Sequence, residues 1–379
     1  MRTIGILGGM MDPIHRGHIG AALAALDAGA DTVLLAPCQS PAHRPRPVAD
    51  AADRLEMCRL AAAADPRLQA SDIELREGIC YAADTVRLLA GQYPGAQICW
   101  ILGADKLPGL ERWHEAQSLF AICDFYVCPR PGFDVFLSVP GARLHVLDAP
   151  AADLSSGQAI RAVTALQDAG DFLTPEVSRY IARQGLYQPD YISVLKRYGM
   201  GEKRLQHTLG VRRTAVDLAF RYGARMQAVS VAATLHDMAK PLPPGRMRAL
   251  ALEYGLKEPE EILSDGNLLH GPLAAVLAEK ELGITDAEVL SAISCHTTGK
   301  AGMGLMDKIL FIADAIEPNR PDYPGLHEIR ALAEKDLDAA VLLSMHRTRD
   351  YVTERGLHFC SRTDTAMRDL EQKRRKERA

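Results

Sequence analysis

The first half of the chain alternates short runs of apolar and β-branched residues with longer segments of helical periodicity. The candidate strands are residues 3–7, 32–36, 68–71, 98–102, 125–128 and 144–146, with helical patterns between them, such as residues 18–28 and 53–64. Strands that alternate with helices predict an α/β domain built on a parallel sheet. Ligands of such sheets bind at the carboxyl ends of the strands, next to the helix starts.

The second half has a different rhythm, because the strand pattern is lost after about Lys196. Apolar or aromatic residues at i, i+4, i+7 and i+11 mark one face of a helix: Val211, Ala215, Leu218 and Tyr222. Gly223 follows them and can terminate that helix. We therefore expect an all-helical second half, so that the predicted fold class is α/β followed by all-α.

Proline, glycine and hydroxyl residues indicate where some of these helices begin and end. Pro272 is expected at a helix start and Gly283 at a helix end. Thr285 and Glu288 have the spacing of a capping box. The junction between the halves is expected at the polar, proline-bearing residues 187–190, which gives domains at residues 1–188 and 195–370.

Length and composition are those of an ordinary globular protein. The 379 residues, 47% of them hydrophobic and 24% charged, suffice for two domain cores. A net charge of −4 gives no basis for general nucleic-acid binding. The start lacks the pattern of a signal peptide, and no apolar stretch reaches the roughly 18 residues of a membrane span.

The eight cysteines are scattered and form no C-x-x-C pair, which favours reduced thiols. We therefore expect a cytoplasmic protein that binds neither a membrane nor nucleic acid. The sequence gives no indication of its oligomeric state.

The first candidate site is the run from Gly8 to His18, where a predicted strand ends in two glycines and a helix begins. Helix starts offer free N–H groups and a positive dipole end, which suit phosphates. His15 and His18 are three residues apart, so both imidazoles can face that place and donate hydrogen bonds to a polyphosphate. The alternative is that the two histidines only cap a helix on a surface loop.

This run resembles the G-G-x-F-D-P-x-H-x-G-H signature of the H-x-G-H nucleotidyltransferases. Further stretches resemble one branch of them, the bacterial nicotinate-nucleotide adenylyltransferases. In chain order these are Pro41-Ala42-His43-Arg44, Ser71-Asp72-Ile73-Glu74-Leu75, Tyr81 with Asp84-Thr85, Leu102-Gly103-Ala104-Asp105 with Leu110 and Trp113, Arg130-Pro131-Gly132, and Ser156-Gly157-Gln158-Ala159-Ile160-Arg161. The ordered series covers nearly all of residues 1–187 and implies a Rossmann-like fold.

The resemblance implies a reaction that joins nicotinate mononucleotide to the α-phosphorus of ATP and releases pyrophosphate, with Mg²⁺ bridging the phosphates. Catalysis is then positioning and charge stabilisation, by His15, His18 and Arg161. The implied ATP-binding residues are Gly8, Gly9, His15, His18, Gly103, Asp105, Ser156, Gly157, Ile160 and Arg161. The implied contacts of the nicotinate nucleotide are His43, Arg44, Tyr81, Thr85, Trp113 and Arg130. Core packing is the alternative for Trp113, and a helix cap is the alternative for Asp105.

Some positions depart from the family pattern. Met10 and Met11 replace a small hydroxyl residue and Phe, and Gln158 replaces Thr in the last motif. Loss of a hydroxyl beside phosphate removes one hydrogen bond, so we expect an active enzyme whose turnover these replacements can lower. The alternatives are an adenylyltransferase for another acceptor, such as nicotinamide mononucleotide or pantetheine phosphate, and a degenerate nucleotide-binding module.

The second candidate site begins with His236 and Asp237, in a predicted helix of small residues from Ala232 to Lys240. An aspartate on an apolar helix is costly unless it is paired or bound to a metal. Adjacent helix positions diverge by about 100°, so both side chains reach one ion only if it lies between them. The alternative is a salt bridge from Lys240 to Asp237.

Four further residues on other predicted helices can join this pair. His207 opens a predicted helix, His270 lies at another helix start, His296 lies near a helix end, and Asp314 is an acid in an apolar helix. Imidazole and carboxylate ligands together suit Zn, Fe or Mn. Six ligands exceed the roughly three that one open catalytic ion needs, so two ions that share Asp237 are the economical arrangement.

The order H…HD…H…H…D resembles the HD superfamily of metal-dependent phosphohydrolases. Four stretches resemble the bacterial HD-type symmetrical diadenosine tetraphosphatases: Leu269-His270-Gly271-Pro272, His296-Thr297-Thr298-Gly299, Met306-Asp307-Lys308 and Glu317-Pro318-Asn319-Arg320. The resemblance implies one ion held by His207, His236, Asp237 and Asp314, and a second held by Asp237, His270 and His296, with iron as the expected metal.

The same resemblance implies that diadenosine tetraphosphate is cut between its middle phosphates into two ADP. Asp237 and Lys240 would then be catalytic, and Lys240 and Arg320 would bind the polyphosphate. For Lys240 and Arg320 the alternative is a surface or ligand-orienting ion pair. For the whole half, the alternatives are hydrolysis of nucleoside monophosphates or cyclic dinucleotides, and a non-catalytic scaffold stabilised by metal.

Overall fold

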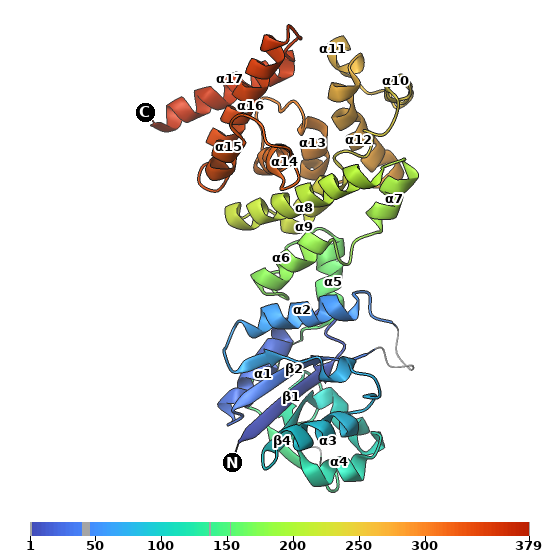
Figure 1. Ribbon diagram of the computed structural model, residues 1–379. Helices are drawn as coiled ribbons and strands as arrows, with labels where there is room; N and C mark the ends of the chain where they lie inside the picture. The colour runs from blue at the N-terminus through green and yellow to red at the C-terminus, as the bar shows by residue number, and fades with distance from the viewer. Residues whose placement is uncertain (1, 40–45, 136–137, 152, 379) are drawn as a thin grey trace. The chain divides into compact units, whose positions relative to one another are not determined.

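The computed structural model describes residues 2–39, 46–135, 138–151 and 153–378. It divides into two compact units, Met1–Tyr180 (the first unit) and Ile181–Ala379 (the second unit). This division falls within helix α6 (Pro175–Gln184), ahead of the predicted junction at residues 187–190. Figure 1 shows both units, which are described separately below.

The first unit is built on a parallel sheet of six strands in the order β3-β2-β1-β4-β5-β6. The strands are β1 (Thr3–Gly9), β2 (Thr32–Pro37), β3 (Leu68–Ala70), β4 (Gln97–Gly103), β5 (Cys123–Cys128) and β6 (Arg143–Val146). Each one overlaps a predicted strand. β1, β2, β4 and β5 are mainly apolar and buried, whereas β6 is mostly exposed. The α/β prediction is confirmed.

The strand order sets the place of a ligand site. Strands β2 and β3 extend the sheet on one side of β1, and β5 and β6 extend it on the other side of β4, so a topological switch point lies between β1 and β4. In the register of the sheet, Ile6 pairs with Trp100 and Gly103 pairs with Cys128. The loops that follow β1, β4 and β5 therefore leave the sheet at the same edge.

The helices of the first unit cover the sheet. They are α1 (Arg16–Asp27), α2 (Ala51–Ala62), α3 (Ala82–Gln92), α4 (Ala116–Ile122), α5 (Ser156–Thr164) and the start of α6, with 3₁₀ segments η1 (Ile73–Leu75) and η2 (Ala104–Arg112). One core cluster joins Ile4 and Trp100 of the sheet to Val86 of α3 and Phe120 of α4. Strands β2 and β5 are buried along their whole length, as expected for a parallel sheet covered on both faces.

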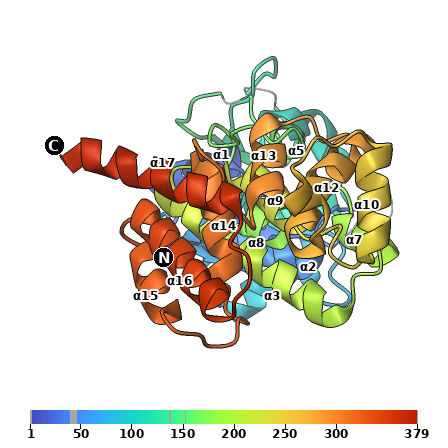
Figure 2. The ribbon, with the colours of Figure 1, turned by 90° about the horizontal axis from the view of Figure 1, so that it is seen from above.

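The second unit consists of helices joined by turns and loops, with no strand among its described residues, as predicted. Its helices after α6 are α7 (Tyr191–Arg197), α8 (Glu202–Tyr222), α9 (Met226–Leu235), α10 (Pro244–Glu253), α11 (Glu260–Leu263), α12 (Gly266–Leu282), α13 (Ala287–Cys295), α14 (Leu305–Ile316), α15 (Leu326–Ala333), α16 (Leu337–Glu354) and α17 (Ser361–Arg378). The buried helix α9 packs against α8, α12, α13 and α14 (Figure 2). As predicted, α8 ends at Gly223, which has a left-handed conformation with φ 72°.

Several predicted helix boundaries are wrong. Pro272 lies inside α12, because Asp265 caps this helix well before the proline and accepts a hydrogen bond from Asn267 N–H. Asp286, not Thr285, caps α13, and its carboxylate accepts hydrogen bonds from two N–H groups of the first turn. A carboxylate is a good N-cap, so these helices begin at aspartates, one well ahead of Pro272 and one next to Thr285.

Three predicted site residues also have a different local setting. Helix α9 ends at Leu235, so His236 is its C-cap and Asp237 lies in the following turn rather than within a helix. His207 lies in the second turn of α8 and does not open that helix. Within the part of the chain that the structure describes, no helix is both long and apolar enough to cross a membrane.

Candidate active sites

The first site lies at the carboxyl end of β1, where the chain enters α1. His15 is the N-cap of α1: its Nδ1 accepts a hydrogen bond from Gly17 N–H (3.1 Å), while its own N–H donates to His18 Nδ1 (3.2 Å). An imidazole that accepts at Nδ1 carries its proton on Nε2 when neutral. The two rings, 3.8 Å apart between centroids, therefore cap the helix with one nitrogen and keep an N–H donor on the other.

Both imidazoles are neutral at physiological pH. Burial lowers the pKa of His15 to about 4, and the charge of Arg130 acts in the same direction. Burial also lowers the pKa of His18 well below its ordinary value, as do His15 and Arg130. The histidines thus offer hydrogen bonds without charge, and the positive charge beside them comes from Arg130.

The loops after β4 and β5 and the start of α5 meet at this turn. Ser156 Oγ donates to the carbonyl oxygen of Pro13 (2.8 Å), and Arg130 Nη1 donates to that of Leu154 (3.1 Å). Arg130 Nε lies 3.8 Å from Asp105 Oδ1. Predicted residues from four separate stretches are therefore assembled at the switch point. Arg130, predicted to contact the nicotinate nucleotide, lies near the two histidines, whose pKa values its charge lowers.

The start of α5 accounts for one departure from the family pattern. Ser155 is the N-cap, and Gln158 closes a capping box because its Oε1 accepts from Ser155 N–H (2.7 Å). Gln158 thus stabilises the helix start in place of the usual threonine. A Cβ at Gly157 would lie 3.5 Å from Arg161 Nη1, so the Arg161 guanidinium lies beside the same helix start.

The residues predicted around the pyridine ring form a second group near α3. The Tyr81 ring, 49% exposed, stacks on His114 with centroids 4.1 Å apart. Trp113 is half-buried and meets Trp100 edge-on at 6.0 Å, so part of its ring does pack against the core. Thr85 is fully buried and its hydroxyl donates to Glu74 (3.1 Å). His43 and Arg44 lie outside the described residues.

The second site joins side chains from α8, α12, α13, α14 and the end of α9. Two groups have the spacing of metal ligands: His207, His236 and Asp237, and Asp237, His270 and His296. Asp237 is common to both, and its two oxygens face different ways. Oδ2 lies 3.6 Å from His236 Nε2 and 3.9 Å from His207 Nε2, whereas Oδ1 lies 3.2 Å from His270 Nε2 and 4.0 Å from His296 Nε2.

Three of these imidazoles are oriented by a hydrogen bond at Nδ1. His236 Nδ1 lies 2.7 Å from the carbonyl oxygen of Ala233, and His296 Nδ1 lies 2.8 Å from that of Ile293. His207 Nδ1 lies 3.1 Å from Glu317 Oε1. Donation from Nδ1 leaves the Nε2 lone pair to face the centre of the site, as in most protein metal sites with histidine ligands.

The donor set fits a metal centre. His236 Nε2 is buried and has no hydrogen-bond partner, which is costly for a polar atom unless an ion binds it. Burial lowers the pKa of His236 and His296 to about 4, so both are neutral, as metal ligands must be. Burial alone would raise the pKa of Asp237, but the surrounding imidazoles hold it well below its ordinary range.

Asp314 and the predicted cations complete the site. Asp314 Oδ1 lies 3.0 Å from His207 Nε2 and accepts a hydrogen bond from Arg320 Nη2 (2.6 Å), so Arg320 takes part in an ion pair that orients a ligand. Lys240 Nζ lies 3.2 Å from Asn267 Oδ1 and 3.3 Å from His270 Nδ1. The partner of Asp237 is Arg204, which the sequence did not indicate.

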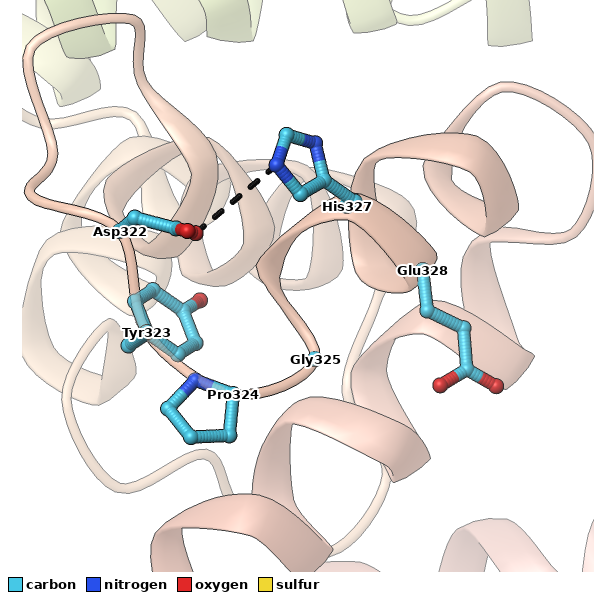
Figure 3. A pocket seen from close by; sticks show the side chains of 6 residues that line it. All are labelled: Asp322, Tyr323, Pro324, Gly325, His327 and Glu328. Atoms are coloured by element: carbon cyan, nitrogen blue, oxygen red, sulfur yellow. Dashed lines mark ion pairs between the residues drawn. The ribbon is translucent and has the colours of Figure 1, made fainter.

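A surface hollow lies on the loop that follows Arg320. It has a volume of about 520 Å³ and is lined by Asp322, Tyr323, Pro324, Gly325, His327 and Glu328. Asp322 and His327 face each other across it at 3.9 Å (Figure 3). None of the predicted site residues lines this hollow, so it is not the centre described above.

Comparisons with known proteins agree with the family resemblance of each half. Residues 6–163 match the cytidylyltransferase-like family model, and residues 204–319 match the HD domain model. The chain is 37% identical over 201 residues to a probable nicotinate-nucleotide adenylyltransferase of Neisseria meningitidis, covering 50% of this chain and all of that one. It is 42% identical over 155 residues to a symmetrical bis(5'-nucleosyl)-tetraphosphatase of Halalkalibacterium halodurans, covering 41% of this chain and 82% of that one.

The first half of the chain belongs to the nicotinate-nucleotide adenylyltransferase family, and the second half to the HD-domain symmetrical bis(5'-nucleosyl)-tetraphosphatase family. Their order along one chain also has a parallel: a probable nicotinate-nucleotide adenylyltransferase/Ap4A hydrolase of Mycoplasma pneumoniae is 27% identical over 351 residues, covering 91% of this chain and 98% of that one. The resemblance stated for each half is thereby confirmed. The first unit is hereafter called the adenylyltransferase-family unit, and the second the HD unit.

Glu317 of the HD unit faces a candidate metal ligand, and the sequence alone did not assign it a role. It is almost fully buried, accepts from Asn319 N–H (2.7 Å) and faces His207 Nδ1. A carboxylate behind a metal-binding imidazole fixes the ring and raises its basicity. Its place in the Glu317-Pro318-Asn319-Arg320 motif was visible, but its partner lies 110 residues earlier in the chain.

We expect Glu317→Ala to lower the metal affinity of the HD unit by about 10- to 100-fold, the usual effect of losing such a partner. Titration of the metal-free protein with Mn²⁺ measures this change. Glu354→Ala, an exposed glutamate of α16, is the control. Equal Mn²⁺ affinity in the two variants would show that Glu317 does not orient the ligand.

Glu74 of the adenylyltransferase-family unit was also missed as a titrating group. Its carboxylate lies under the glycine turn, since a Cβ at Gly8 would lie 3.0 Å from Glu74 Oε2 and 2.8 Å from the Trp100 ring. Burial raises the pKa of Glu74 to about 7, although the hydrogen bond from Thr85 opposes the shift. The absence of a side chain at Gly8 therefore serves internal packing, in addition to any approach of phosphate.

The shift predicts a pH-dependent stability. The pKa of Glu74 in the folded protein lies above the unfolded value of 4.5. The contribution of protonated Glu74 to the free energy of unfolding is therefore fully present below about pH 4.5 and is lost as the pH rises through about 7. Glu74→Gln should therefore stabilise this unit at pH 8.5, by at most about 3 kcal/mol, and leave it nearly unchanged at pH 4.5.

Thermal unfolding followed by tryptophan fluorescence tests this prediction, because both tryptophans of the chain, Trp100 and Trp113, lie in this unit. The exposed neighbour Glu77→Gln is the control. A Tm difference between Glu74→Gln and wild type that does not change with pH would rule out an ionised, buried Glu74 as its cause.

Proposed function

We propose that the protein is a bifunctional nucleotide enzyme. The adenylyltransferase-family unit transfers AMP from ATP to nicotinate mononucleotide, giving nicotinate adenine dinucleotide and pyrophosphate. The HD unit hydrolyses diadenosine tetraphosphate symmetrically to two ADP. The observation that supports the hydrolase most directly is the shared carboxylate of Asp237, whose two oxygens face separate pairs of imidazoles.

In the transfer reaction, a phosphate oxygen of nicotinate mononucleotide attacks the α-phosphorus of ATP, and the bond to pyrophosphate breaks. No protein nucleophile is needed, so the residues position and stabilise charge. His15 and His18 donate from Nε2 to the phosphates of ATP. Arg130 and Arg161 supply positive charge, and the start of α5 supplies N–H groups. Mg²⁺ accompanies ATP, bound through its phosphates.

In the hydrolysis, His207, His236, Asp237 and Asp314 would hold one ion, and Asp237, His270 and His296 would hold the other. Such a pair would supply an activated water and neutralise charge on the attacked phosphate. Lys240 donates a proton to the departing ADP, and Lys240 and Arg320 bind the polyphosphate. Iron is proposed as the metal, because imidazole and carboxylate ligands suit it, as they do Mn and Zn; elemental analysis distinguishes the three.

Product analysis of the purified, metal-loaded protein tests both activities. ATP is supplied with nicotinate mononucleotide, nicotinamide mononucleotide or pantetheine phosphate in parallel, and a separate panel contains diadenosine tetraphosphate, nucleoside monophosphates and cyclic dinucleotides. We expect dinucleotide and pyrophosphate from the first acceptor, and only ADP from diadenosine tetraphosphate. Nucleotide binding without pyrophosphate release would reject the transferase, and AMP with ATP as the hydrolysis products would reject symmetrical cleavage.

A further inference from the structure

Three cationic side chains surround the ligand cluster of the HD unit, and they come from separate segments. Arg204 lies in the first turn of α8, Lys240 in the turn after α9, and Arg320 in the loop after α14. Arg204 Nη1 is paired with Asp237 Oδ2, just as Arg320 Nη2 is paired with Asp314 Oδ1. Two arginines thus hold the two acids of the cluster from its outer side.

In each of these two ion pairs, the aspartate is more deeply buried than the arginine. The Asp237 side chain is 5% exposed, whereas that of Arg204 is 40% exposed; for Asp314 and Arg320 the values are 21% and 36%. Each arginine therefore reaches from solvent to a more deeply buried acid and uses only part of its guanidinium to do so. A guanidinium has five N–H donors in a planar fork, so Arg204 keeps donors for a ligand that approaches from solvent.

Arg204 also lies close enough to Lys240 for the two positive charges to interact. Burial lowers the pKa of Lys240, and the positive charge of Arg204 acts in the same direction. The carboxylates of Asp237 and Asp314 act on Lys240 in the opposite direction, and a bound anion would reduce the repulsion between the two cations further. A chain of phosphates is such an anion, and the fork of an arginine suits the oxygens of a phosphate.

We propose that Arg204 is a polyphosphate-binding residue of the HD unit, positioned by Asp237 so that its outer N–H groups bind a non-bridging phosphate oxygen of the substrate. The proposal rests on the function proposed above, and it adds that the site prefers longer phosphate chains. A tetraphosphate can place separate phosphate groups against Arg204, Lys240 and Arg320, whereas a single phosphate offers all three side chains the same group.

Binding of inorganic phosphates tests this without relying on the nucleotide. Calorimetry measures the affinity of the Mn²⁺-loaded full-length protein for phosphate, pyrophosphate and tripolyphosphate. We expect Arg204→Gln to weaken tripolyphosphate binding by about 10-fold or more, the effect of losing one charged hydrogen-bond donor, and to weaken phosphate binding less. KM for diadenosine tetraphosphate should rise by a similar factor, with a smaller change in kcat.

Two further variants separate binding from a structural role. Arg213→Gln removes an exposed arginine from the same helix and should leave every value unchanged. Arg204→Lys keeps the charge without the fork and should recover part of the tripolyphosphate affinity. It also carries the test if Arg204→Gln does not fold, since it should then bind tripolyphosphate measurably more weakly than wild type.

Titration of Mn²⁺ into the metal-free variants measures their metal affinity and can contradict the proposal. If Arg204→Gln binds Mn²⁺ more weakly while the loaded protein binds tripolyphosphate as wild type does, Arg204 only orients Asp237 and the proposal is overturned. Unchanged tripolyphosphate affinity in both Arg204 variants would overturn it too. If the wild-type protein does not cleave diadenosine tetraphosphate, the proposed substrate fails, but the tripolyphosphate comparison still decides the role of Arg204.

Discussion

Asp237→Ala should lose the bound metal and lower hydrolysis of diadenosine tetraphosphate on the order of 1000-fold or more. The physical reason is that both oxygens of this carboxylate are in use: Oδ1 faces His270 and His296, and Oδ2 faces His207 and His236. Removing them takes a ligand from both proposed ions. Elemental analysis of the purified variant and a kinetic assay of ADP formation measure the two effects.

Two controls accompany this variant. Asp350→Ala removes an exposed aspartate of α16 and should keep both metal and activity. Adenylyl transfer by Asp237→Ala itself should be normal, since the residues of the two sites lie in different units. Wild-type hydrolysis in Asp237→Ala, with the metal retained, would refute the site.

His18→Ala should lower adenylyl transfer by about 100-fold or more, which is the usual effect of removing a donor to a transition state. His18 Nδ1 accepts from the N–H of His15, so Nε2–H is the group left to donate to phosphate in the proposed reaction. Pyrophosphate release in the presence of ATP and nicotinate mononucleotide is the measurement. The alanine variant also removes an acceptor from the start of α1, so its effect combines two causes.

Two conservative variants separate those causes. The Oδ1 of asparagine can replace Nδ1 as the acceptor, and the Nε2 of glutamine can replace the lost donor. We expect His18→Asn to be as stable as wild type but nearly as inactive as His18→Ala, and His18→Gln to recover part of the activity. If His18→Asn turns over at the wild-type rate, the Nε2–H of His18 is not needed for catalysis.

The sequence was sufficient to predict the strands, the helices and the types of residue at each site. It was not sufficient to predict which distant segments contact one another. Strands such as β1 and β4 were found because a buried strand is a short apolar run. The switch point between them was not visible, since strand order depends on contacts between distant segments. Two helix starts were misplaced at Pro272 and Thr285, because the carboxylates of Asp265 and Asp286 cap these helices instead.

For the sites, too, the sequence indicated the residues but not the residues that they contact. The six proposed metal ligands stood out because histidine and aspartate are unusual in apolar helices. Five of them approach one another within metal-binding distance, and Asp314 lies beside His207. Glu317 and Arg204 were missed, because an acid or an arginine near a helix end is unremarkable until the residue it contacts is known. Their partners, His207 and Asp237, lie 110 and 33 residues away in the chain.

The capping of α1 by His15 and His18 has a consequence for the energy of substrate binding. A free histidine side chain populates several rotamers, and fixing it against a ligand costs conformational entropy. Here the backbone N–H groups of Gly17 and His15 already hold both rings at Nδ1. The entropy of ordering the rings is therefore lost once, when the chain folds, and does not weaken the affinity for ATP at each turnover.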